Sequence, residues 1–82
     1  MDRDKIKDEL AEIIGPYIPD KELLKDLSEE KDLINDLNIN SAHIVDIVLD
    51  IEEKYDITID DDAIGKMNTV GESIDIILEK VS

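Results

Sequence analysis

The stretch that decides the fold is Leu37-Asn38-Ile39-Asn40-Ser41-Ala42-His43-Ile44-Val45-Asp46-Ile47-Val48. Its second half has apolar residues at helical spacing, which is typical of an amphipathic helix. Asn40 is a good N-cap, because its side-chain oxygen can accept a hydrogen bond from an amide of the first turn. Ser41 then takes the first helical position, among unpaired N–H groups at the positive end of the helix dipole. A phosphate carried on the Ser41 oxygen is favoured in such a place.

The helix that we expect over residues 41–55 has three different faces at 100° per residue. The apolar face, which we assign to the core, consists of Ile44, Ile47, Val48, Ile51 and Tyr55. The opposite face is acidic and carries Asp46, Asp50 and Glu53. A narrow third stripe is formed by Ala42, Val45 and Leu49. This stripe is either partly buried under a neighbouring loop or an exposed docking surface ringed by carboxylates.

Three more helices are predicted from periodicity and capping signals. Residues 2–14 form the first, which Gly15-Pro16 ends, with the glycine in a C-cap conformation. Asp60 caps a brief helix that runs to about residue 66, and Thr69 and Glu72 form a capping box that opens the last helix.

Residues 17–40 form a long connection between the first two of these helices. Asp20 and Ser28 can each start a short helical turn in it. Its leucine clusters are expected to hold it against the core. The sequence therefore predicts an all-α fold: a small four-helix bundle of three longer helices and one short helix, with a long loop between the first two. Residues 1–82 are enough for one domain with a thin core.

Net charge and composition exclude several classes of partner. With 23 acidic and 9 basic residues the chain carries a formal charge of −14, which disfavours binding to nucleic acid or to anionic membrane surfaces. The natural partner is a protein with a basic patch. There is no cysteine, and no apolar run approaches the roughly 20 residues of a membrane span. The expectation is a cytoplasmic monomer without membrane insertion.

The frame around Ser41 resembles the acyl carrier proteins. The resemblance rests on a leucine upstream (Leu37), a serine that opens a helix, and the acidic run Ile51-Glu52-Glu53-Lys54-Tyr55-Asp56-Ile57, and it covers about residues 32–81. It implies that a phosphopantetheinyl transferase uses coenzyme A to place a 4'-phosphopantetheine arm on Ser41. The arm would hold acyl intermediates as thioesters for fatty-acid or polyketide-type biosynthesis. The reactions would belong to acyl-chain enzymes with basic patches, so the protein itself would not be an enzyme.

The resemblance also implies which residues partners recognise. Asp46, Glu52 and Glu53 match positions where the family tends to be acidic, beside the stripe of Ala42, Val45 and Leu49. The chain departs from the family at the serine itself. The family usually reads Asp-Ser-Leu, whereas this chain reads Asn40-Ser41-Ala42. In the family, the aspartate helps the modifying synthase and its magnesium engage the serine, and the leucine makes an apolar contact with partners. The loss of both points to a specialised carrier.

Other chemistry finds little support in the sequence. His43, the single histidine, is two residues from Ser41, and residues two apart on a helix do not face each other, so a catalytic dyad is excluded. Asp60-Asp61-Asp62 lacks the ligand spacing of a calcium loop, and no metal cluster can be assembled. The alternative function is an unmodified acidic helical module that binds a basic protein, in which Ser41 only caps its helix.

Overall fold

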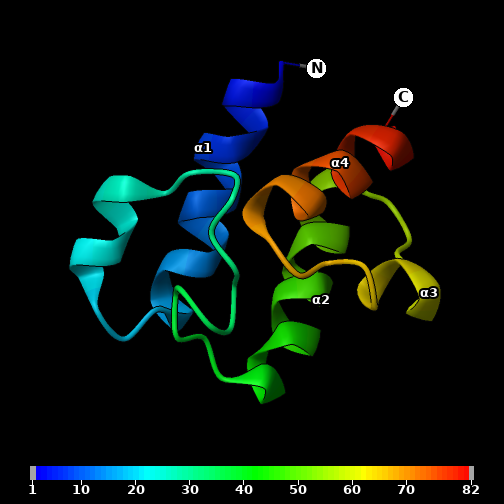
Figure 1. The fold of residues 1–82 in the computed structure, drawn as a ribbon. Coiled ribbons are helices and arrows are strands. Elements are labelled where there is room, and N and C mark those ends of the chain that lie inside the picture. The colour runs from blue at the N-terminus through cyan, green and yellow to red at the C-terminus, as the bar shows by residue number, and fades with distance from the viewer. Residues whose placement is uncertain (1, 82) are drawn as a thin grey trace.

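The computed structural model describes residues 2–81, the side chain of Asp26 excepted, and these residues form helices and no strand. The α-helices are α1 (Arg3–Ile14), α2 (Ile44–Tyr55), α3 (Asp61–Ile64) and α4 (Val70–Val81). Short 3-10 turns lie at η1 (Gly15–Tyr17), η2 (Lys21–Asp26) and η3 (Ser41–His43). The three long helices lie together, α3 lies at their edge, and the long connection crosses over to α4 before it reaches α2 (Figure 1). The predicted all-α bundle, with three longer helices and one short one, is confirmed. None of the described helices has the length and apolar character needed to cross a membrane.

The core is aliphatic, and α1, α2 and α4 each contribute three or more buried residues to it. Helix α1 packs against both α2 and α4. On α2 the predicted core face is confirmed, with Ile47, Val48 and Ile51 buried and Ile44 and Tyr55 half-buried. The remaining buried apolar residues of α1 and α4 are Ile6, Leu10, Ile14, Val70, Ile74, Ile76 and Ile77.

The helix caps follow the sequence closely. At α4 the Thr69 amide donates to Glu72 Oε1 and the Glu72 amide donates to Thr69 Oγ1, both at 3.1 Å, which is the predicted capping box. Asp60 accepts from the Ala63 amide at 2.8 Å at the start of α3, as expected.

The first helix ends at Ile14 as predicted, but the predicted conformation of Gly15 is wrong. Gly15 is right-handed (φ −49°, ψ −48°), so it does not adopt the left-handed conformation typical of a C-cap glycine, and the chain continues into the 3-10 turn η1. Pro16 follows as the second residue of that turn, where its missing N–H costs nothing. The short turns predicted at Asp20 and Ser28 are both present: Asp20 caps η2, and the Ser28 carbonyl accepts from the Lys31 amide at 3.2 Å in a single turn.

The long connection is held by apolar residues and by backbone hydrogen bonds. Its buried members are Leu27, Leu33, Leu37 and Ile39, together with Ile18. In addition, residues 29–33 run beside the start of α4. The Leu33 amide donates to Asn68 O at 2.9 Å, the Val70 amide to Lys31 O at 3.0 Å, and the Gly71 amide to Glu29 O at 2.9 Å. The leucine contacts were predicted, whereas this backbone pairing was not.

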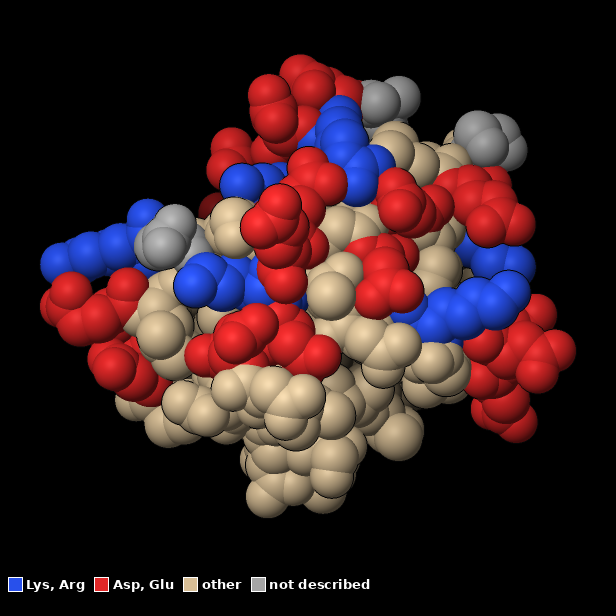
Figure 2. Space-filling model, in the orientation of Figure 1, with Lys and Arg blue, Asp and Glu red and all other residues tan. Residues whose placement is uncertain are grey.

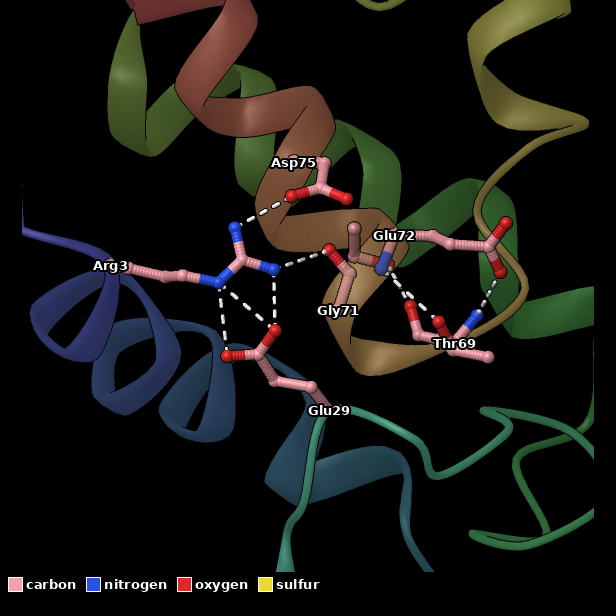
Figure 3. A network of polar contacts seen from close by, with 7 residues as sticks. Arg3, Glu29, Thr69, Gly71, Glu72 and Asp75 are labelled. Carbon is pink, nitrogen blue, oxygen red and sulfur yellow. Dashed lines mark hydrogen bonds and ion pairs between the residues drawn. The ribbon is translucent and has the colours of Figure 1, made fainter.

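Arg3 joins three parts of the fold at one point (Figure 3). Its Nε lies 3.0 Å from both carboxylate oxygens of Glu29, its Nη1 lies 2.6 Å from Asp75 Oδ1, and its Nη2 lies 3.4 Å from Gly71 O. The hydrogen bond from Arg3 lowers the pKa of Glu29 below its ordinary value. The cluster therefore ties α1 to the connection and to α4.

Candidate functional site

Ser41 is exposed and is the first residue of a helical turn. This turn leads directly into the long helix α2 (Figure 1). The turn is η3, and the Ser41 carbonyl accepts a hydrogen bond from the amide of Ile44, the first residue of α2. The turn and the helix are therefore continuous. An exposed serine on such a support is accessible to another protein.

Asn40 caps this turn through both its side chain and its main chain. Its backbone is extended (φ −63°, ψ 132°), its Oδ1 accepts from the Ala42 amide at 2.9 Å, and its carbonyl accepts from the His43 amide at 2.8 Å. The expectation that unpaired amides surround Ser41 is therefore wrong for these two, because Asn40 already occupies them. The helix start can still attract a phosphate through its dipole, and residue 40 carries no carboxylate that would repel the phosphate.

The segment before Ser41 is a tight, ordered loop. Asp32 Oδ1 accepts from the amides of Asn35 and Ile34, both at 2.9 Å, and these bonds lower the pKa of Asp32. Further along, the Ile39 amide bonds to Leu33 O at 3.1 Å. Asn38 between these points has φ 58°, a left-handed conformation that asparagine adopts more readily than most residues. Together these features fix the direction in which the chain arrives at Ser41.

The apolar stripe on α2 is exposed. Ala42 faces solvent, and Val45 and Leu49 are 58% and 55% exposed, so no loop covers them. Of the two alternatives that the sequence left open, burial under a loop is thereby excluded. The third large apolar side chain with comparable exposure in residues 2–81 is Ile34, in the loop that precedes the site.

The acids of α2 do not share one environment. Asp46 and Glu53 are exposed, and Asp46 Oδ2 lies 3.6 Å from His43 Nδ1. Asp50 accepts a hydrogen bond from the Tyr17 hydroxyl at 3.1 Å. Glu52 is half-buried and accepts from the Ile59 amide at 2.7 Å, so one of its oxygens is committed to the segment after α2.

Tyr17 is a neighbour of the site that the sequence analysis missed. Its ring lies 5.2 Å from that of His43, at 42°, and its hydroxyl bonds to Asp50, so η1 packs along one side of α2. Burial raises the pKa of Tyr17, and the hydrogen bond to Asp50 raises it further. Nothing in the spacing of residues 17 and 43 indicates this contact. In the described part of the chain, no group of three or more His, Asp or Glu side chains could hold a metal ion.

Known proteins with a similar sequence agree on one family. No protein-family model matches the chain. An acyl carrier protein from a species of Exiguobacterium is 36% identical over 64 residues, which cover 74% of this chain and 81% of the relative. Another from Acidothermus cellulolyticus is 34% identical over 79 residues, covering 94% and 89%. The chain belongs to the acyl carrier protein family.

The fold supports the same assignment. The structure of an acyl carrier protein from Enterococcus faecalis superposes with a TM-score of 0.79 at 25% identity, over 98% of this chain and 99% of that one. The resemblance noted around Ser41 is thus confirmed as a family relationship. Acyl carrier proteins are carriers in acyl-chain biosynthesis rather than catalysts, so the chemistry to be explained is attachment and presentation.

Proposed function

We propose that this acyl carrier protein holds acyl intermediates as thioesters on a 4'-phosphopantetheine arm attached to Ser41. The observation that supports this proposal is the exposed Ser41 hydroxyl at the first turn leading into α2. In the attachment reaction the hydroxyl oxygen forms a bond to the β-phosphorus of coenzyme A, adenosine 3',5'-bisphosphate leaves, and the hydroxyl proton passes to a base of the transferase. The attached arm supplies a terminal thiol, which forms the thioester.

The residues around Ser41 fit a phosphodiester. Asn40 is uncharged, and no acidic residue occurs between Asp36 and Asp46, so the nearest stretch of chain does not repel the phosphate. The helix dipole adds a modest attraction. Ser41 itself is exposed, so an arm on its oxygen can extend away from the protein.

We further propose that partners dock on α2 beside Ser41. The apolar contacts would come from Ala42, Val45 and Leu49, and the charge from Asp46, Glu53 and Glu52. Exposed ion pairs each contribute only about 0–1 kcal/mol, so these acids act by steering association with basic patches rather than by one dominant contact. Glu52 adds its charge to this surface while one of its oxygens is held by Ile59. The expected partners are a phosphopantetheinyl transferase and the enzymes that build or transfer acyl chains, of the fatty-acid or polyketide type.

Intact-mass measurement tests the attachment directly. The unmodified protein is incubated with coenzyme A and a broad-specificity transferase. The wild type should gain the mass of one phosphopantetheine and Ser41→Ala should gain none, because only Ser41 presents its hydroxyl at the start of α2. Ser28→Ala is the matched control and should be modified like the wild type. No mass gain with several transferases would instead favour an unmodified acidic interaction module.

A further inference from the structure

The turn η3, which carries Ser41, projects from one end of the bundle. Each of its three residues is exposed, so the turn contributes nothing to the hydrophobic core and is not held by it. In Figure 2 the lower end of the molecule, where α2 begins in Figure 1, projects below the charged side chains. A 3-10 turn has poorer hydrogen-bond geometry than an α-helix, and the ends of helices open most readily. The orientation of Ser41 therefore depends on the contacts that hold this turn against α2.

Tyr17 makes such a contact, and it contacts both sides of the junction between η3 and α2. Its ring lies 5.2 Å from the His43 ring at an angle of 42°, a separation typical of attractive aromatic pairs. Its hydroxyl donates to Asp50 Oδ2 at 3.1 Å. His43 is the last residue of η3, and Asp50 lies about two turns further along the same face of the helix. One side chain thus spans the point where the 3-10 turn becomes an α-helix.

The turn η1, from which the Tyr17 side chain extends, is itself firmly held. Gly15 and Ile18, which flank this position in the chain, are both buried. The Lys21 ammonium donates to Gly15 O at 2.7 Å and to Ile18 O at 3.0 Å. The Ile18 amide closes the turn on Gly15 O at 3.1 Å, and Pro16 fixes a backbone dihedral within it. Because η1 is anchored in the core, it can restrain the exposed turn η3 through this contact.

We propose that Tyr17 is a positioning residue, which holds the turn η3 against α2 and thereby keeps Ser41 in the orientation that the attachment reaction needs. The inference rests on the proposed attachment at Ser41 and gives a role in it to a residue outside the helix. Tyr17 acts through His43 and Asp50 rather than on the reacting atoms. Asp46 Oδ2 also lies 3.6 Å from His43 Nδ1 across the same junction, but exposed pairs of this kind contribute little. Holding a reacting group in the right geometry can change a rate by large factors.

Amide hydrogen exchange of the unmodified protein, followed by NMR, tests the holding role without the attachment reaction. The His43 and Ile44 amides bond to Asn40 O and Ser41 O, so their exchange reports on opening of the turn. In Tyr17→Leu both amides should exchange about fivefold faster or more, whereas Tyr17→Phe keeps the ring and should stay within about twofold of the wild type. Tyr55→Leu is the matched control, because it removes a tyrosine at the other end of α2 and should leave these amides unchanged. Equal exchange in Tyr17→Leu and the wild type, or the same increase in Tyr55→Leu, overturns the inference.

Attachment kinetics supply a readout that a merely structural role would not move. With a transferase and saturating coenzyme A, kcat for Tyr17→Leu should fall about fivefold or more while KM stays within about twofold of the wild type. The reason is that the exposed residues of α2 are unchanged, whereas Ser41 is correctly oriented for less of the time. Tyr17→Phe should retain the wild-type kcat, and an unchanged kcat in Tyr17→Leu overturns the positioning role. A wild type that gains no phosphopantetheine would instead count against attachment at Ser41, and hydrogen exchange would still decide whether Tyr17 holds the turn.

Discussion

Glu52 shows how one side chain can belong to a recognition surface and also complete the fold. Its carbonyl accepts from the amides of Asp56 and Ile57, and its carboxylate accepts from the Ile59 amide at 2.7 Å. Asp56 has φ 55°, the left-handed conformation that ends α2. The side chain thus supports the turn that leads the chain out of α2.

We expect Glu52→Ala to lower the free energy of unfolding by about 1–2 kcal/mol, because a charge-assisted hydrogen bond to the amide of the buried residue Ile59 is lost. Glu53→Ala, at the adjacent exposed position, should change it by no more than about 0.5 kcal/mol. Urea denaturation followed by circular dichroism measures both. Equal effects of the two substitutions would show that the Ile59 bond contributes nothing specific.

Among the elements, the pairing of residues 29–33 with the start of α4 depends on a glycine. A Cβ added at Gly71 would lie 3.0 Å from Glu29 Cβ and 3.1 Å from Glu29 O, which is tighter than most real Cβ contacts, so the backbone of residues 29–33 would have to shift by a few tenths of an ångström. Gly71→Ala should therefore destabilise the protein by about 1–3 kcal/mol, as in other overpacked sites.

Gly65 is the matched control for this substitution. A Cβ there would meet its nearest atom, Asp62 O, at an ordinary 3.5 Å, and its φ of −62° suits any residue. Gly65→Ala should change stability by about 0.5 kcal/mol or less, in the stabilising direction. The Tm values of the two variants, measured by thermal unfolding, test this prediction. Equal Tm values for Gly71→Ala and Gly65→Ala would contradict the close approach of Gly71 to Glu29.

The Arg3–Glu29 contact, which joins α1 to residues 29–33, makes the stability of the folded state depend on pH. The hydrogen bond from Arg3 holds the pKa of Glu29 below its ordinary value, so ionised Glu29 stabilises the folded state above about pH 4.3, and this stabilisation is lost as pH falls through the lowered pKa. The Tm of Glu29→Gln should lie several degrees below that of the wild type near pH 7, and the two should converge toward about pH 3. A difference in Tm that is the same at both pH values would rule out this linkage.

The elements also show what a sequence can and cannot predict. The caps at Asn40, Asp60 and Thr69 were predicted because a cap lies within a few residues of the amide that it binds. The backbone pairing of residues 29–33 with residues 68–71 was not, because main-chain hydrogen bonds between distant segments leave no side-chain pattern. The contact of Tyr17 with His43 and the bond of Glu52 to Ile59 were missed for a related reason. Each depends on how segments pack in space, which helical periodicity does not describe.

For the whole molecule, the dominant electrostatic term is repulsion among acids. Residues 46–62 contain eight acidic residues and one lysine, and the entire chain carries −14. Dissolved salt screens such repulsion over a distance of about 10 Å at 0.1 M. The Tm should therefore rise as NaCl is added from about 10 mM to about 500 mM.

A less acidic variant provides the control. Glu53→Gln combined with Asp8→Asn removes two charges at exposed positions. It should unfold at a higher temperature than the wild type in low salt and gain less on addition of NaCl. A wild-type Tm that does not respond to salt would mean that the favourable pairs, such as Arg3–Glu29, balance the repulsion.

The two tyrosines lie on different contacts of α2, and the chain has no tryptophan or phenylalanine. Tyr17 contacts His43 in the turn η3 and bonds to Asp50, while Tyr55, the last residue of α2, donates from its hydroxyl to Glu9 at 2.9 Å. The protein's near-ultraviolet absorption and emission therefore come from two known positions. One of these chromophores reports on the end that carries Ser41, and the other serves as an internal reference, so events at that end can be followed optically without an added dye.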